Sequence, residues 1–243
     1  MKFIVLLFIL TFQNPAFSFV LLNPKYRLKD PTKAQVKLSA EGCTSEGISD
    51  DEMVSSINWA IEFWNDVPES RLKLSYGGRS SATLSDSRIP ENEIIVGCDD
   101  DLPSNNILGA TEHDRANGSA RVTMNSNVYN SGSNYRKASF IGTMAHEIGH
   151  GVGLYHSNDP ASIMTYANHE WVDLPTYISQ DDIDGVVYMY PNESSMGGFL
   201  GSCASFASDS RETKQFPFDF IFGFIGVLFV SVLLRITGRF LRK

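Results

Sequence analysis

The stretch HEIGHGVGLYH, residues 146–156, is the most informative part of this chain. His146 and His150 stand four residues apart, so on a helix their imidazoles lie on one face, one turn apart. Their ring nitrogens then reach one ion at about 2.0–2.1 Å. Gly153 permits the left-handed backbone that ends a helix, and the resulting turn returns His156 as a third ligand. Three neutral imidazoles and one open position predict a catalytic Zn²⁺ site rather than a closed structural one.

Glu147 is the candidate general base of this site. It is rotated by about 100° from its helical neighbours, so it would lie beside a water on the ion instead of chelating the ion. A lone HExxH pattern also arises by chance in helices that bind no metal. Here three of the five histidines stand at ligand offsets, which favours one catalytic zinc ion.

Hydrophobic periodicity on both sides of this stretch predicts an α/β domain. Strands are expected at residues 35–38, 72–76, 93–96 and 120–124. Helices are expected after the capping residues Ser49 and Ser179, and a further helix from about residue 137 to 154. The order β-α-β-β-β-α-α indicates three helices packed on a mixed sheet.

The long motif resembles that of the metzincin zinc peptidases, and Ser157 after the third histidine resembles their matrixin branch. Residues 162–166 (SIMTY) resemble the Met-turn, which would place Met164 as an apolar floor beneath the imidazoles. Residues 180–185 (QDDIDG) and 59–67 resemble the last and first helices of matrixins. The resemblance covers most of residues 35–191.

This resemblance implies a metzincin-like (zincin) catalytic domain with a mixed, mostly parallel sheet, three helices and an active-site cleft. It also implies zinc-dependent hydrolysis of protein or peptide substrates, with Glu147 as general base and the substrate antiparallel to residues 120–125. The relatives hold a second, structural zinc through three His and one Asp. Here only His113 and His169 remain, so we expect that site to be absent and both to be surface or loop histidines.

A second class of protein fits the same ligands. A membrane-tethered adhesion or binding module would hold zinc without cleaving anything. The intact Glu147 argues against this reading, because the three histidines alone would suffice to hold the metal.

The acidic composition argues against nucleic acid as a partner, and one acidic run is a candidate Ca²⁺ site. Lys and Arg number 20 against 28 Asp and Glu, for a net charge of −8, which argues against a nucleic-acid binder with a basic surface. The run Asp99, Asp100 and Asp101 either holds Ca²⁺ through its carboxylates or forms a solvated loop.

The N-terminal residues read as an export signal. Lys2 precedes an apolar run, and small residues lead to an expected cleavage after Ser18, which defines a signal peptide at 1–18. The alternative is an uncleaved anchor, but about ten apolar residues are too few to cross a hydrocarbon core that needs about 20. Residues 19–192 then form the metallopeptidase domain.

The C-terminal residues predict a membrane anchor. A flexible linker, 193–215, precedes an apolar span at 216–236, which ends in a basic cytoplasmic tail, 237–243. This arrangement predicts a single-pass protein of the cell membrane with its catalytic domain outside the cytoplasm, or one released after tail processing. A buried core helix and a removed lipid-anchor signal are the alternatives.

The chain has three cysteines, and export would place them in an oxidising environment. Cys43 and Cys98 could form a disulfide in the oxidising exterior that export implies. Cys203 is left over before the anchor and is free, lipid-modified or part of a processing site.

Overall fold

The computed structural model describes part of the chain. The described residues are 19–99, 102, 107–114, 118–127, 136–166, 178–192 and 205–206. All of them belong to the first of two units, Met1–Ser208. The expected signal peptide, the transmembrane span and the basic tail lie outside the described residues, as does all of the linker except 205–206. Among the helices that are described, none combines the length and apolarity that a membrane crossing requires.

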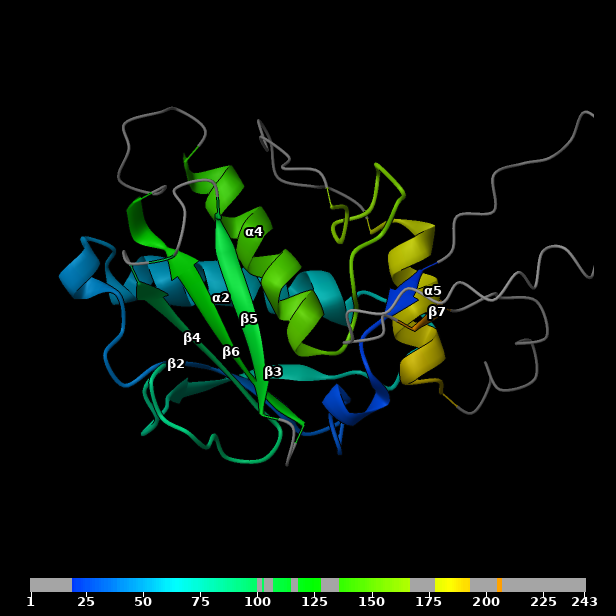
Figure 1. The fold of residues 1–243 in the computed structure, drawn as a ribbon, viewed down its shortest axis with the longest axis horizontal. Coiled ribbons are helices and arrows are strands. Elements are labelled where there is room, and N and C mark those ends of the chain that lie inside the picture. Colours follow the sequence, from blue (N-terminus) through cyan, green and yellow to red (C-terminus); the bar gives the residue numbers. More distant parts are fainter. Residues whose placement is uncertain are drawn as a thin grey trace, which may run out of the picture. The chain divides into compact units, whose positions relative to one another are not determined.

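A five-stranded sheet forms the centre of this unit, in the order β3-β2-β4-β6-β5 (Figure 1). Its strands are β2 (Ala34–Leu38), β3 (Leu74–Arg79), β4 (Glu93–Asp99), β5 (Gly109–Asp114) and β6 (Ser119–Asn125). The pairs β2–β3, β2–β4 and β4–β6 are parallel, whereas β5 runs antiparallel to β6 at one edge. The expected mixed, mostly parallel sheet is therefore confirmed.

The three expected helices are α2 (Asp50–Asn65), α4 (Arg136–Gly151) and α5 (Gln180–Met189). Ser49 caps the N-terminus of α2 and Ser179 caps that of α5. Each side chain accepts a hydrogen bond from the backbone N–H three residues further on. Helix α4 ends three residues earlier than expected, because the chain turns at Gly153. Short 3-10 helices, η1 (Pro24–Tyr26) and η2 (Thr44–Glu46), and a two-stranded sheet of β1 (Val20–Leu21) and β7 (Ser205–Phe206) complete the described elements.

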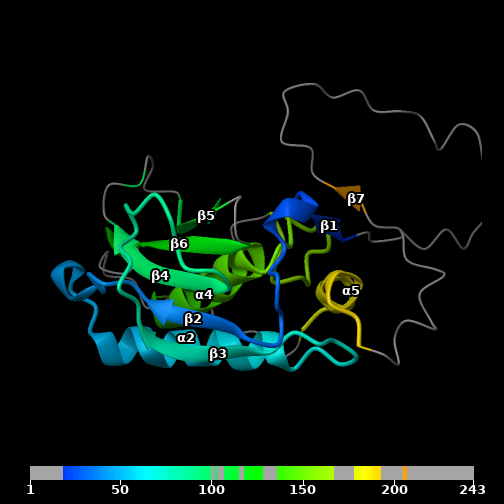
Figure 2. The ribbon, with the colours of Figure 1, turned by 90° about the horizontal axis from the view of Figure 1, so that it is seen from below.

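One face of the sheet packs against α2 and α4 (Figure 2) and forms the main core. Alternate residues of β4 and β6, such as Ile94, Val96 and Val122, point into this core and are fully buried. Trp64 of α2 is also fully buried and donates from its indole N–H to the Ala145 carbonyl, 2.8 Å away. This bond holds α2 against α4 at the residue before His146.

Strand β5 was not among the expected strands. Its sequence GATEHD has no apolar alternation, because its inner face lies against Glu147 of α4 instead of the hydrophobic core. The strand also corrects the expected path of the substrate. Strand β6 is hydrogen-bonded to β4 on one side and β5 on the other, so residues 120–125 have no free edge for a substrate, and this expectation is wrong.

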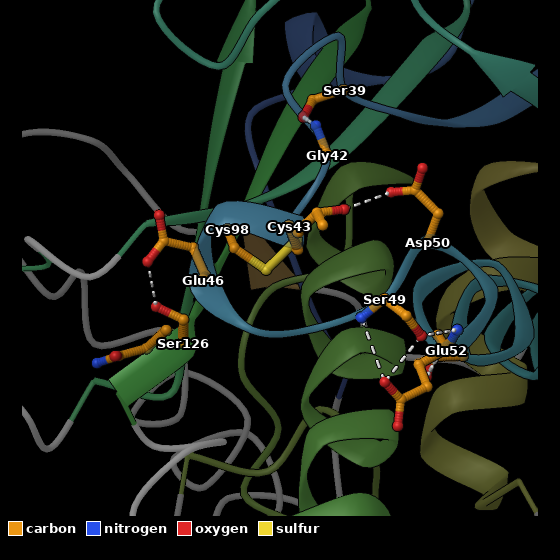
Figure 3. The surroundings of a disulfide bond; sticks show 12 residues. Ser39, Gly42, Cys43, Glu46, Ser49, Asp50, Glu52, Cys98 and Ser126 are labelled. Carbon is orange, nitrogen blue, oxygen red and sulfur yellow. Dashed lines mark hydrogen bonds between the residues drawn. A yellow bond between two sulfur atoms is a disulfide. The ribbon is translucent and has the colours of Figure 1, made fainter.

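The expected disulfide between Cys43 and Cys98 is present (Figure 3). It joins the residue before η2 to β4, with the two Cα atoms 5.2 Å apart, and Cys43 is fully buried. Nearby, the Ser126 hydroxyl donates to the Glu46 carboxylate across 3.4 Å. The bridge thus fixes the segment that leads into the capping residue of α2.

Candidate metal centre

Helix α4 carries two of the three clustered histidines and packs unusually close to its neighbours at Gly149. A Cβ atom at Gly149 would lie 2.3 Å from the Met164 sulfur and 2.6 Å from the Trp64 ring. Only glycine leaves room for these contacts. Met164 is 2% exposed, and its side chain lies against the backbone between His146 and His150.

The turn after α4 directs His156 back toward the helix. The Gly153 N–H donates to the His150 carbonyl at 2.8 Å, and the Leu154 N–H donates to the Gly149 carbonyl at 3.0 Å. Together with the φ of 109° at Gly153, these bonds form a Schellman motif, which ends the helix and reverses the chain. His156 therefore approaches from outside the helix.

The structure brings His146, His150 and His156 together, with one ligand atom from each within 4.8 Å of the others. The Nε2 atoms of His150 and His156 are 3.3 Å apart. Two nitrogens on a tetrahedral zinc at 2.0–2.1 Å would be separated by about 3.3–3.4 Å. The donor set therefore fits zinc in its chemistry, and the His150–His156 pair also fits it in spacing.

Backbone carbonyls orient two of the imidazoles. Nδ1 of His146 lies 2.6 Å from the Ile163 carbonyl, and Nδ1 of His150 lies 2.8 Å from the Leu154 carbonyl. A carbonyl only accepts, so each Nδ1 carries the proton and each Nε2 lone pair faces the centre. Burial lowers the pKa of His150 well below its ordinary value and lowers that of His156, which keeps these rings in the neutral form that binds metal.

Residues beyond the motif support this geometry. The Asp182 carboxylate accepts from the Ser162 hydroxyl at 2.6 Å and from the Ile163 N–H at 3.0 Å. Because the Ile163 carbonyl orients His146, the first turn of α5 helps to fix the centre. The sequence marked Asp182 only as a helix-capping position, since a contact across 19 or 20 residues has no local signal.

Glu147 lies next to the histidines on α4 and is 6% exposed. Burial raises the pKa of its carboxyl to about 7, and a hydrogen bond from Thr111 opposes that rise. A carboxylate with a pKa near neutrality is well matched to accept and return a proton at physiological pH.

The raised pKa of Glu147 predicts a pH-dependent cost in the metal-free protein. Between about pH 4.5 and 7 the folded state holds a proton that the unfolded state has released, so this group lowers stability as pH rises through that window. Glu147→Gln removes the effect. In chelator, the free energy of unfolding of the variant should match wild type below pH 4.5 and exceed it by about 3 kcal/mol above pH 7. Denaturant titrations at several pH values measure this, and a pH-independent difference would contradict it.

Other expected residues lie elsewhere. His113 is not a surface or loop histidine, which corrects that expectation: it is in β5, its ring stacks on Tyr26 with centroids 4.6 Å apart, and both ring nitrogens are buried. Burial lowers its pKa to about 4, and it is not part of the three-histidine cluster. His169, Asp100 and Asp101 lie outside the described residues.

Gly109 of β5 leaves room for the Glu147 side chain. A Cβ at Gly109 would lie 2.8 Å from Cγ of Glu147 and 3.2 Å from Cγ2 of Thr143. Gly109→Ala should therefore displace Glu147 and lower any activity that depends on this carboxyl group by about tenfold, a few times RT, while metal binding is retained. Kinetics with metal analysis measures this. Ala110→Ser adds an atom to the other face of β5 and serves as control, and unchanged activity in Gly109→Ala would contradict the prediction.

The fold and the centre together define a class of protein: a metzincin, with an HExxH helix, a glycine turn and a third histidine on a mixed sheet. Comparison with known families makes this more specific. Residues 32–191 match the matrixin family, and the chain belongs to that family.

Individual relatives match over shorter stretches. The chain is 40% identical over 57 residues to the macrophage metalloelastase of Oryctolagus cuniculus, covering 23% of this chain and 12% of that protein. It is 47% identical over 47 residues to the human neutrophil collagenase, covering 19% and 10%. Matrix metalloproteinase-27 of Tupaia belangeri is 49% identical over 47 residues, covering 19% and 9%. The alignments thus span only about a tenth of these relatives.

Proposed function

We propose that this protein is a zinc endopeptidase, with His146, His150 and His156 as metal ligands and Glu147 as general base. The observation that carries the proposal is the buried carboxylate of Glu147 beside three converging imidazoles. Membership of the matrixin family supports it. A site that only stored zinc would not need a buried carboxyl group next to its ligands.

The residues of the chain have separate tasks in the proposed reaction. When bound, zinc acts as a Lewis acid and lowers the pKa of water at the centre to about 7. The Glu147 carboxylate accepts a proton from the attacking water and then returns it to the amine that leaves. The Ile163 and Leu154 carbonyls hold the imidazoles of His146 and His150 in the tautomer that binds metal. Met164 forms the apolar side of the metal centre.

The free edge of β5 is the proposed path of the substrate. Strand β5 is an outer strand of the five-stranded sheet, and no described strand pairs with its second edge. Its residues Gly109 and Thr111 lie against Glu147. A peptide that pairs with this edge through main-chain hydrogen bonds would pass directly beside the site.

We also propose that the protein is exported and is tethered to the cell membrane by residues 216–236. The carboxylates at residues 99–101 are the proposed ligands of an additional Ca²⁺ ion. The apolar span and the basic residues after it support this orientation. Alkaline carbonate extraction of membranes, combined with N-terminal sequencing of the mature chain, tests both ends. Release into the soluble fraction of intact, unprocessed chain would overturn the anchor.

The test of the function uses the full chain in mild detergent with a diverse peptide mixture analysed by mass spectrometry. Wild type, chelator-treated protein and protein reloaded with zinc are compared. Internal cuts that disappear with chelator and return with zinc are expected. No cuts from protein with zinc bound would overturn the peptidase and favour a binding module.

A further inference from the structure

Thr111 lies on β5 with its hydroxyl close to two acceptors of Glu147, the side-chain carboxylate and the backbone carbonyl. Its Oγ1 lies 2.6 Å from the Glu147 carboxylate oxygen Oε2 and 2.9 Å from the Glu147 backbone carbonyl oxygen. A distance of 2.6 Å is typical of a hydroxyl that donates to a carboxylate, a bond stronger than one between neutral groups. The Thr111 hydroxyl therefore donates its proton to the hydrogen bond with the Glu147 carboxylate.

This hydroxyl is the one side-chain donor to the Glu147 carboxylate among the described residues. Glutamate has three rotatable side-chain bonds, and packing against Gly109 restricts its methylene groups without fixing the terminal torsion that turns the carboxylate. The bond from Thr111 joins the carboxylate to a fixed point and so restricts that rotation. A carboxylate held in one direction stays aligned with the histidines next to it.

The fixed point is rigid because β5 is hydrogen-bonded to β6 along its inner edge. Thr111 pairs with Val122 in the β5–β6 ladder, and Val122 is fully buried in the core. Threonine is also β-branched, so its χ1 angle is restricted in a strand. The position of the hydroxyl is thus set by the sheet, independently of helix α4 that carries Glu147.

We propose that Thr111 is a positioning residue that holds the Glu147 carboxylate in the orientation needed for proton transfer; this rests on the proposed function. Thr111 donates to the base and does not ligate the metal. Its loss therefore affects the catalytic step more than substrate binding, and leaves metal content unchanged. The structure assigns this task to a residue outside the HExxH motif, on a strand with no sequence signature.

The test compares Thr111→Val, which has the same shape without the hydroxyl, with Thr111→Ser, which keeps the hydroxyl. Thr123→Val on β6 is the matched control, because the same change is made where no hydrogen bond to Glu147 exists. We expect Thr111→Val to lower kcat about tenfold with KM and bound zinc unchanged. Thr111→Ser should recover most of the loss, and Thr123→Val should behave like wild type.

A second measurement does not depend on activity. In metal-free protein, Thr111→Val should lower the thermal midpoint more in the wild-type background than in the Glu147→Ala background, because the alanine variant lacks the carboxylate and keeps only the weaker acceptor, the backbone carbonyl of residue 147. Equal shifts in both backgrounds would overturn the contact. A rise in KM at constant kcat, or a Thr111→Ser variant as slow as Thr111→Val, would overturn the positioning role.

Failure of this inference is distinguishable from failure of the proposed function. If wild type cleaves and Thr111→Val cleaves equally fast, only the role of Thr111 is overturned. If zinc-loaded wild type cleaves nothing, the peptidase proposal fails and the positioning role fails with it.

Discussion

Replacing Glu147 by Gln is expected to lower kcat by about 10²–10⁴-fold, the range that a lost general base produces. The amide has nearly the same shape as the carboxylate but does not accept the proton of the attacking water. The three histidines and the carbonyls that orient them are untouched, so bound zinc should remain at the wild-type level. The amide oxygen still accepts a bond from Thr111, so the fold at the site should persist.

Steady-state kinetics and metal analysis on the same preparations measure this effect. Glu112→Gln is the matched control, because Glu112 lies on the same strand as Thr111 with its side chain exposed. That variant should retain wild-type kcat. A Glu147→Gln protein that keeps zinc and more than a tenth of wild-type kcat would mean that another group moves the proton.

Local sequence patterns were sufficient to predict most of the fold and the three histidine ligands. The helix that bears His146 and His150 follows from spacing within one turn, and the Ser49 and Ser179 caps follow from offsets of three residues. The disulfide was expected from the compartment and is present. In each case the interacting residues are close in sequence, or their chemistry leaves few partners to choose from.

The missed features arise from contacts that sequence spacing does not encode. Strand β5 has polar residues on both faces because one face lines the site, so apolar alternation is absent. His113 therefore looked like a loop residue although its ring nitrogens are buried. The contact from Thr111 to Glu147 spans 36 residues, and its existence depends on the order of strands in the sheet.

Removing the disulfide with Cys43→Ala and Cys98→Ala together is expected to lower the free energy of unfolding by about 4 kcal/mol. The bridge closes a loop of 55 residues that contains α2 and β3, so it restricts the unfolded chain strongly. For a domain of this size the thermal midpoint should fall by about 10–15 °C. Alanine avoids placing a serine hydroxyl at Cys43, which is fully buried.

Calorimetry of the oxidised and reduced protein separates the bridge from the side chains. Reduced wild type should melt near the double variant, whose own midpoint should not respond to reductant, and Cys203→Ala should melt like oxidised wild type. A double variant as stable as the oxidised protein would contradict the prediction. The bridge joins the segment before α2 to β4, and no hydrogen bond among the described residues links it to the histidines or to Glu147. At temperatures where the variant is folded, its kcat should therefore equal that of wild type. Lost stability with unchanged kcat would show that the sheet, once folded, positions β5 and Glu147 without help from the covalent bond.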